Sequence, residues 1–252
     1  MRIAAWAVCL IGCVNSLCCL NSLCSEEPAP PADPTSGGRY VFREEHDPNG
    51  IGKFYLGREI AHVMGHQGIS WLERPEREEE EGLSALVKAL ELKPGQSVAD
   101  IGAGSGVISL LLSEQVGPQG TVLAVDIQQE MLDALAVNCK KKNITNILPV
   151  LGTTTSPNLK PGSVDLIIMV DVYHEFDMPY EMLSEIAKSL KSGGRVAFVE
   201  YRKEDPRVLI KEVHKMAEKQ VKREASVEGL NLVWQKTYTG LPRQHVIFFE
   251  RQ

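Results

Sequence analysis

Short apolar segments alternate with helix-like segments through most of this 252-residue chain after residue 75. The apolar segments have the length and β-branched content of buried strands, and they lie at 97–101, 121–127, 147–151, 164–170, 195–200, 232–238 and 245–250. Helical patterns lie before and between them, at 75–90, 105–116, 129–142, 179–190 and 206–224. Strands that alternate with helices predict a parallel sheet covered on both faces. The short link at 239–244 makes the last pair antiparallel.

The composition agrees with a chain that folds around a core and does not bind nucleic acid. Apolar residues make up 43% of the chain, which is enough for a hydrophobic core. The net charge of -6 argues against a nucleic-acid partner, because phosphate binding requires a basic surface. The oligomeric state is left open by these observations.

The first 38 residues have the pattern of a targeting segment. An apolar run follows Arg2 and ends at Gly12; it is too short to span a bilayer but suits a signal peptide. The sequence at 10–13 resembles a bacterial lipobox, in which Cys13 would carry a lipid. We therefore expect a leader at 1–24 and a Pro-rich flexible linker at 25–38. The protein would then be exported, either periplasmic or held at a membrane by the lipid alone, and cytoplasmic if the leader does not function.

A glycine-rich turn, VADIGAGSG at 98–106, separates the first predicted strand from the next helix. Glycine lets the backbone approach a ligand closely, and free amide groups at a helix start bind polar groups. The turn therefore predicts a nucleotide-like cofactor at the carboxyl ends of the strands.

The spacing in this turn separates two cofactor classes. A dinucleotide site needs a glycine three positions after Gly104, and Val107 stands there instead. Asp100 inside the turn would repel a pyrophosphate, whereas it suits the sulfonium and ammonium groups of S-adenosylmethionine (SAM). Asp126 ends the second strand, where it can bind ribose hydroxyls in either class; it could also cap the helix that follows.

The pattern Asp100-x-Gly102-x-Gly104-x-Gly106 and the strand VDLIIMVDVYHEF at 164–176 resemble class I SAM-dependent methyltransferases. The resemblance implies a Rossmann-like domain at 75–252, preceded by a lid or cap segment at 39–74. It also implies which residues bind the cofactor: Asp100, Ile101, Gly102, Ala103 and Gly104 at the methionine portion, Asp126 at the ribose, Ile127 at the adenine, Gly152 and Thr153 near the adenine amine, Asp171 beside the reactive methyl, and Gly106 in the turn. Such enzymes often have an acidic or small polar residue that touches the adenine amine, and in this chain the residue is Thr153.

The reaction implied is methyl transfer from SAM to a small-molecule acceptor. Candidates for its catalytic residues follow the fourth strand: Asp171, Tyr173 and His174, with Glu175 beside them. His174 is the expected general base, because imidazole titrates near neutrality; alternatively it only lines the pocket. The chain lacks the Asn/Asp-Pro-Pro-Tyr form used on nucleic-acid adenine. Two alternatives remain. The protein could bind a nucleoside without catalysis, or it could be another SAM-using transferase.

Other polar residues give weaker signals. His62 and His66 lie four apart but lack the glutamate of HExxH, and Gly65 weakens a helix there, so we predict no metal site. The segments GREI at 57–60 and WLER at 71–74 resemble an uncharacterised exported bacterial methyltransferase-like group. Tyr201 and Arg202 could line the acceptor pocket, whereas His214 and His245 have the character of structural histidines.

Overall fold

The computed structural model describes residues 38–252, so the predicted leader and nearly all of the predicted linker lie outside the described residues. A large sheet forms the centre of the molecule, with the strand order β10-β11-β8-β7-β4-β5-β6. Only β11 is antiparallel to its neighbours. The strands are β4 (Ser97–Ile101), β5 (Thr121–Asp126), β6 (Ile147–Leu151), β7 (Val164–Val170), β8 (Leu190–Arg202), β10 (Leu232–Tyr238) and β11 (Gln244–Arg251). The predicted fold is confirmed, and a two-residue strand, β9 (Lys215–Met216), is added beside β8.

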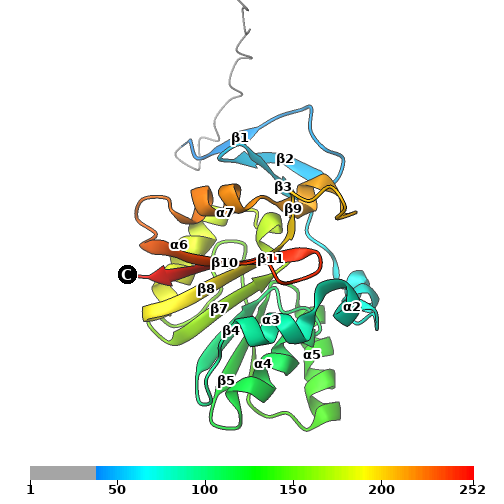
Figure 1. Ribbon diagram of the computed structural model, residues 1–252, viewed down its shortest axis with the longest axis vertical. Helices are drawn as coiled ribbons and strands as arrows, with labels where there is room; N and C mark the ends of the chain where they lie inside the picture. The colour runs from blue at the N-terminus through cyan, green and yellow to red at the C-terminus, as the bar shows by residue number, and fades with distance from the viewer. Residues whose placement is uncertain (1–37) are drawn as a thin grey trace, which may run out of the picture.

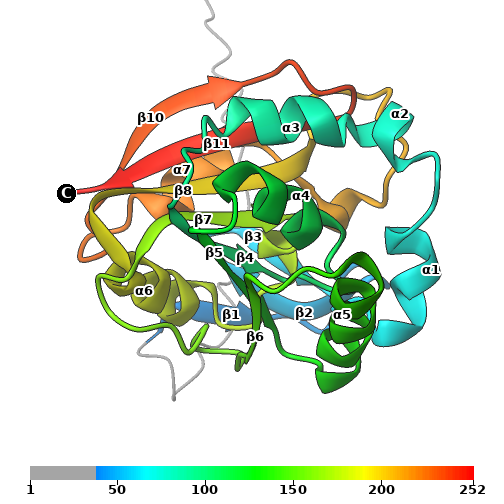
Figure 2. The ribbon, with the colours of Figure 1, turned by 90° about the horizontal axis from the view of Figure 1, so that it is seen from below.

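Helices cover both faces of this sheet (Figure 2). One core cluster joins the sheet to α3 (Leu83–Ala89), α4 (Val107–Val116) and α5 (Gln129–Lys142). The other cluster joins the opposite face to α6 (Pro179–Ser189) and α7 (Glu218–Ala225). In β7, Leu166 and Ile168 pack in the first cluster, whereas Ile167 and Met169 pack in the second. Successive side chains of β7 therefore point into the two clusters in turn, as expected for an apolar strand that is buried on both faces.

Two of the predicted helices differ in the structure. The segment 75–90 is interrupted at Gly82, whose φ of 70° ends α2 (Arg77–Glu81) before α3 begins. The helix predicted at 206–224 is wrong over its first half. That half contains a single turn, η3 (Glu212–His214), followed by β9. Leu209, in this first half, is 91% exposed.

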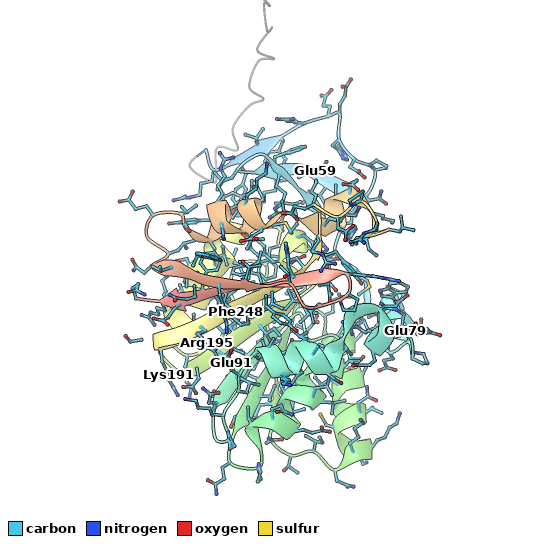
Figure 3. The ribbon with its side chains drawn as sticks, in the orientation of Figure 1. Glu59, Glu79, Glu91, Lys191, Arg195 and Phe248 are labelled. Atoms are coloured by element: carbon cyan, nitrogen blue, oxygen red, sulfur yellow. The ribbon has the colours of Figure 1, made fainter. Side chains whose placement is uncertain are left out.

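A small antiparallel sheet precedes the large one and lies above it in Figure 1. Its strands are β1 (Tyr40–Phe42), β2 (Gly50–Tyr55) and β3 (Arg58–Ala61), and the turns η1 (His66–Gly68) and α1 (Ile69–Leu72) follow. No strand is predicted from the sequence within the lid or cap segment at 39–74, so these three strands are an addition to the predicted fold. Glu59, labelled in Figure 3, accepts hydrogen bonds from the amides of Asp47 and Gly52 and thereby closes the loop before β2.

A buried ion pair attaches this small sheet to the large domain. Arg58 donates from Nε and Nη2 to the two carboxylate oxygens of Glu224, at 2.8 and 2.9 Å. The two side chains are 8% and 0% exposed. Arg58 also donates to the carbonyl of His174, and Tyr173 donates its hydroxyl to Glu224. The pair therefore links β3, α7 and the turn η2 (Tyr173–Glu175) that follows β7.

Among residues 38–252, no helix combines the length and the apolar character needed to cross a bilayer.

Replacing one partner of this ion pair tests its contribution. Arg58→Met leaves a buried carboxylate without its cation, so we expect the free energy of unfolding to fall by about 3–5 kcal/mol. The matched control is Lys188→Met, which removes the exposed pair with Glu185 and should cost less than about 1 kcal/mol. Urea denaturation measures both changes. Equal losses in the two variants would contradict the role given to Arg58.

Candidate functional site

A cavity of about 640 Å³ lies at the carboxyl edge of the central strands. This volume falls within the range of small-molecule sites. The turns after β4, β5, β6 and β7 contribute one part of its wall, and the N-terminal segment and residues 209–214 contribute the other. The residues that line the cavity include Asn49, His62, Met64, Trp71, Leu72, Ile101, Gly102, Gly104, Asp126, Ile127, Gly152, Thr153, Asp171, His174, Glu175, Tyr201 and His214.

The glycine-rich turn has no room for side chains. Gly102 and Gly104 have φ of 76° and 56°, a region that favours glycine. A Cβ on Gly102 would lie 2.5 Å from a methyl of Val172, and one on Gly104 would lie 2.6 Å from Leu72. Both glycines line the cavity, whereas Gly106 lies at the start of α4 with φ of 90° and does not. The turn thus presents bare backbone to the cavity.

Asp126 connects two of the turns around the cavity. Its Oδ2 accepts the amide of Gly104, and its Oδ1 accepts the amide of Gln128, both at 2.9 Å. Burial raises the pKa of this carboxyl. The side chain therefore holds the backbone at Gln128, where α5 is about to start, and it also borders the cavity.

Asp100 lies deeper than we expected. It is 1% exposed and accepts a 2.6 Å hydrogen bond from the hydroxyl of Ser109. It borders a small pocket of about 20 Å³ behind the turn, together with Ala103, and neither residue lines the large cavity. Burial raises the pKa of Asp100 to about 6. A direct contact of Asp100 with a cofactor stays a prediction.

The residues predicted near an adenine are together on one wall. Ile127 is 42% exposed and lines the cavity with Gly152 and Thr153. The Thr153 hydroxyl accepts the amide of Ser156 at 2.9 Å, so it is already used in a local turn.

Asp171 ends β7 in a strained conformation on the cavity wall. Its φ is 52°, unusual for a residue other than glycine, and such strain is concentrated at functional sites. Oδ2 accepts a hydrogen bond from Gln244, whereas the buried Oδ1 has no partner among the described residues. Burial, together with the charges of Glu81 and Glu200, raises the pKa of Asp171 well above its usual value.

Next to Asp171 is a group of four side chains that we call the His–Glu cluster: His174, Glu175, Glu200 and His214. His174 Nδ1 lies 2.6 Å from a carboxylate oxygen of Glu200, and its Nε2 lies 3.0 Å from Nδ1 of His214. Glu200 also accepts the amide of Tyr173 at 3.0 Å, and Glu175 accepts the amide of Met64 at 3.3 Å. Each carboxylate is thus fixed by backbone.

Burial sets the charges of this cluster. It raises the pKa of Glu175 to about 7 and of Glu200 to about 8. It lowers the pKa of both His174 and His214 to about 4. At neutral pH both imidazoles are therefore uncharged, and each has one N–H and one nitrogen with a lone pair.

The structure separates the predicted catalytic candidates. Asp171 and His174 line the cavity, whereas Tyr173 is fully buried, does not line it and is bound to Glu224. We therefore propose no catalytic role for Tyr173. Of the other candidates in the sequence, His62 and Tyr201 line the cavity, and His66 and Arg202 do not.

Sequence reasoning missed Glu200 and misjudged His214. Glu200 is a carboxylate at the end of the apolar run 195–200, as Asp126 is at the end of its own run, so its place at the same sheet edge could have been predicted from the sequence. His214 was placed in a long helix, and its true position in η3 depends on packing against η2.

Comparisons with known proteins agree with this geometry. Residues 98–194 match the family described as a methyltransferase domain. The arsenite methyltransferase of Halobacterium salinarum is 30% identical over 106 residues, which are 42% of this chain and 27% of that protein. The nocamycin O-methyltransferase of Saccharothrix syringae is 29% identical over 112 residues, 44% and 40% of the two chains. The chain spans about half or less of the length of the curated relatives it matches.

Solved structures show the same fold. A SAM-dependent methyltransferase from Aquifex aeolicus aligns with a TM-score of 0.70 and 23% identity, covering 75% of this chain and all of that one. The chain therefore has the Rossmann-like fold of that protein, and residues 98–194 are similar to methyltransferase domains.

The buried carboxyl of Asp100 predicts a measurable pH effect. Because its folded pKa of about 6 is raised above the ordinary 3.8, the native state keeps a proton that the unfolded chain releases. Stability from this group is present below pH 4 and is lost as pH rises toward 6. Asp100→Asn should therefore equal the wild type near pH 4 and exceed it at pH 7 by about 3 kcal/mol.

Chemical denaturation from pH 4 to pH 7 measures this difference. Asp133→Asn, an exposed change on α5, serves as the control and should give a constant difference from the wild type. A difference for Asp100→Asn that does not change with pH would contradict the prediction.

Proposed function

We propose that this protein transfers a methyl group from S-adenosylmethionine to a small-molecule acceptor inside the large cavity. One observation carries the proposal. The cavity joins the bare glycine turn and Asp126 on one side to the strained, half-satisfied carboxylate of Asp171 on the other.

The residues present fit the cofactor. Gly102 and Gly104 present bare backbone to the cavity at points where a Cβ would collide with Val172 and Leu72, and Asp126 offers carboxylate oxygens beside them. The free Oδ1 of Asp171 is a buried acceptor, and a cationic ligand beside it would favour the ionised form of this carboxyl. S-adenosylmethionine supplies, when bound, a methyl group activated by a positively charged sulfur. We propose that Asp126 holds its ribose, that Ile127, Gly152 and Thr153 border its adenine, and that Asp171 lies beside the methyl.

The size of the cavity favours a small acceptor. Asn49, Met64 and Trp71 from the N-terminal segment and His214 from η3 line it together with the residues proposed to bind the cofactor. We propose that residues 39–74 act as a lid that excludes water and aligns the acceptor. Support also comes from the relatives whose names specify arsenite and nocamycin, which are small molecules.

The acceptor would meet His174 at the end of the cavity. Its imidazole is neutral at pH 7, which is the charge state that a proton acceptor requires, and Glu200 holds Nδ1 while Nε2 faces His214. Export of the protein through the predicted leader stays a prediction, because the leader lies outside the described residues.

Cofactor binding is the first test. We expect calorimetric titration of SAM, and of S-adenosylhomocysteine, into the full chain to show one site. Asp126→Ala should weaken it about 10- to 100-fold, which is the loss of one or two hydrogen bonds to a charged group. Asp133→Ala, on the exposed face of the adjacent helix α5, should leave the affinity unchanged.

A second measurement separates the alternatives. The denaturation midpoint of Asp126→Ala shows whether that variant is folded, because Asp126 also holds two backbone amides. Mass spectrometry then follows S-adenosylhomocysteine production against a panel of hydroxyl, thiol and amine acceptors. Cofactor binding without turnover on any acceptor would favour the non-catalytic alternative. No cofactor binding by the folded parent would overturn the proposal.

A further inference from the structure

Three ligand atoms of the His–Glu cluster converge beside the cavity. They are Nε2 of His174, Nδ1 of His214 and Oε1 of Glu175. Nε2 and Nδ1 lie 3.0 Å apart, and Oε1 lies 3.8 Å from the first and 3.7 Å from the second. From these three separations we infer that the cluster is a binding site for a divalent first-row transition metal, of the kind that takes imidazole and carboxylate ligands.

The dimensions of the triangle support this inference. A point in its plane lies about 2.0 Å from all three atoms, which is the bond length of zinc to histidine nitrogen and carboxylate oxygen. Any three atoms have such an equidistant point, so the support comes from the value of this distance, which leaves room for one ion of that size. Two imidazoles favour zinc, cobalt or iron(II) over magnesium or calcium, which prefer oxygen ligands throughout.

The surroundings orient all three ligands. Nδ1 of His174 is turned toward Glu200, and a carboxylate on the second imidazole nitrogen is the usual partner of a metal-bound histidine. The other oxygen of Glu175 accepts the amide of Met64, so Oε1 is left toward the histidines. Glu200 is fully buried, and Arg58, which lies near it, is already paired with Glu224. A bound cation would favour the ionised forms of Glu175 and Glu200.

The site is open on one side only. His174 is 2% exposed, whereas His214 is 22% exposed, and all three ligand residues line the large cavity. Three protein ligands with a remaining position toward a cavity are the arrangement of catalytic metal sites, whereas structural zinc sites use four. A hydroxyl or thiol of the acceptor would complete the coordination.

The chemical role suggested for this site rests on the proposed function, whereas the site itself does not. Coordination lowers the pKa of a bound hydroxyl or thiol. Its proton would pass to solvent, and its lone pair would form the new bond to the methyl carbon as the carbon–sulfur bond of the cofactor breaks. In that case His174 acts as a ligand, and Glu200 is a positioning residue.

Zinc binding is measured on the full chain after treatment with a chelator. Accessible thiols are first alkylated, because five cysteines lie within the first 24 residues and thiolates also bind zinc. We expect calorimetry to show one Zn²⁺ per chain and Co²⁺ to give the visible absorption of a four- or five-coordinate ion. Glu175→Gln, which keeps the shape of the side chain, and His214→Ala should weaken binding at least about 100-fold. Glu200→Gln should weaken it about 10- to 100-fold.

The control variant is His66→Ala, which removes a histidine that does not line the cavity and should leave zinc affinity unchanged. Denaturation midpoints in chelator show which variants are folded. Absence of binding by the parent, or binding that Glu175→Gln and His214→Ala both leave intact, would overturn the inference. SAM titrations on the same samples keep the two proposals apart: SAM binding without zinc binding rejects the metal site alone, and zinc binding without SAM binding rejects the proposed function alone.

Discussion

The buried ion pair between Arg58 and Glu224 connects the parts of the chain from which the cavity is built. Removing two charges from water costs several kcal/mol, and only close bidentate geometry offsets that cost. The small sheet therefore has one position in which Arg58 is satisfied, and any shift would leave a buried charge without a partner. Because Arg58 also binds the carbonyl of His174, the position of the small sheet and the position of η2 are fixed by the same side chain.

Carboxylates concentrate where the parallel strands end. Asp126, Asp171 and Glu200 lie at the carboxyl ends of β5, β7 and β8, and burial raises the pKa of each. Groups that are costly to ionise in this state are stabilised by cationic ligands. Both a sulfonium cofactor and a divalent cation bound in the cavity would stabilise the ionised forms of these carboxylates. Binding of either ligand should also stabilise the fold, because the unfolded chain has no such site.

His174 has two possible uses, and the tertiary contacts distinguish them. A general base needs a lone pair directed at the acceptor, whereas the Nε2 of His174 is directed at His214, 3.0 Å away. In the absence of an ion, one imidazole can donate to the other, and Glu200 extends this into a chain of three groups. An ion at the centre of the triangle would replace that hydrogen bond and make the acceptor itself more acidic. Both arrangements use Glu200 to choose the tautomer of His174.

The sequence by itself determined the central sheet and the part of the site that the glycine turn and Asp126 form. Continuous apolar runs such as 164–170 can only be buried on both faces, and the glycine turn and Asp126 are local features that directly follow strands. Most of those boundaries agree with the structure to within one or two residues, although Gly82 and the segment 206–217 do not follow the predicted helical pattern and β8 begins at Leu190 and not at residue 195. The small N-terminal sheet was missed because its strands are short and β2 contains two glycines.

Tertiary structure alone decided the other half of the site. His174 and His214 lie 40 residues apart, in two single turns with no shared motif, and they meet only because η3 packs against η2. The depth of Asp100, the burial of Tyr173 and the pairing of Arg58 with Glu224 likewise depend on contacts between distant segments. The periodicity of apolar residues indicates which face of a helix or strand is buried, but it does not indicate which side chains from distant segments will contact that face.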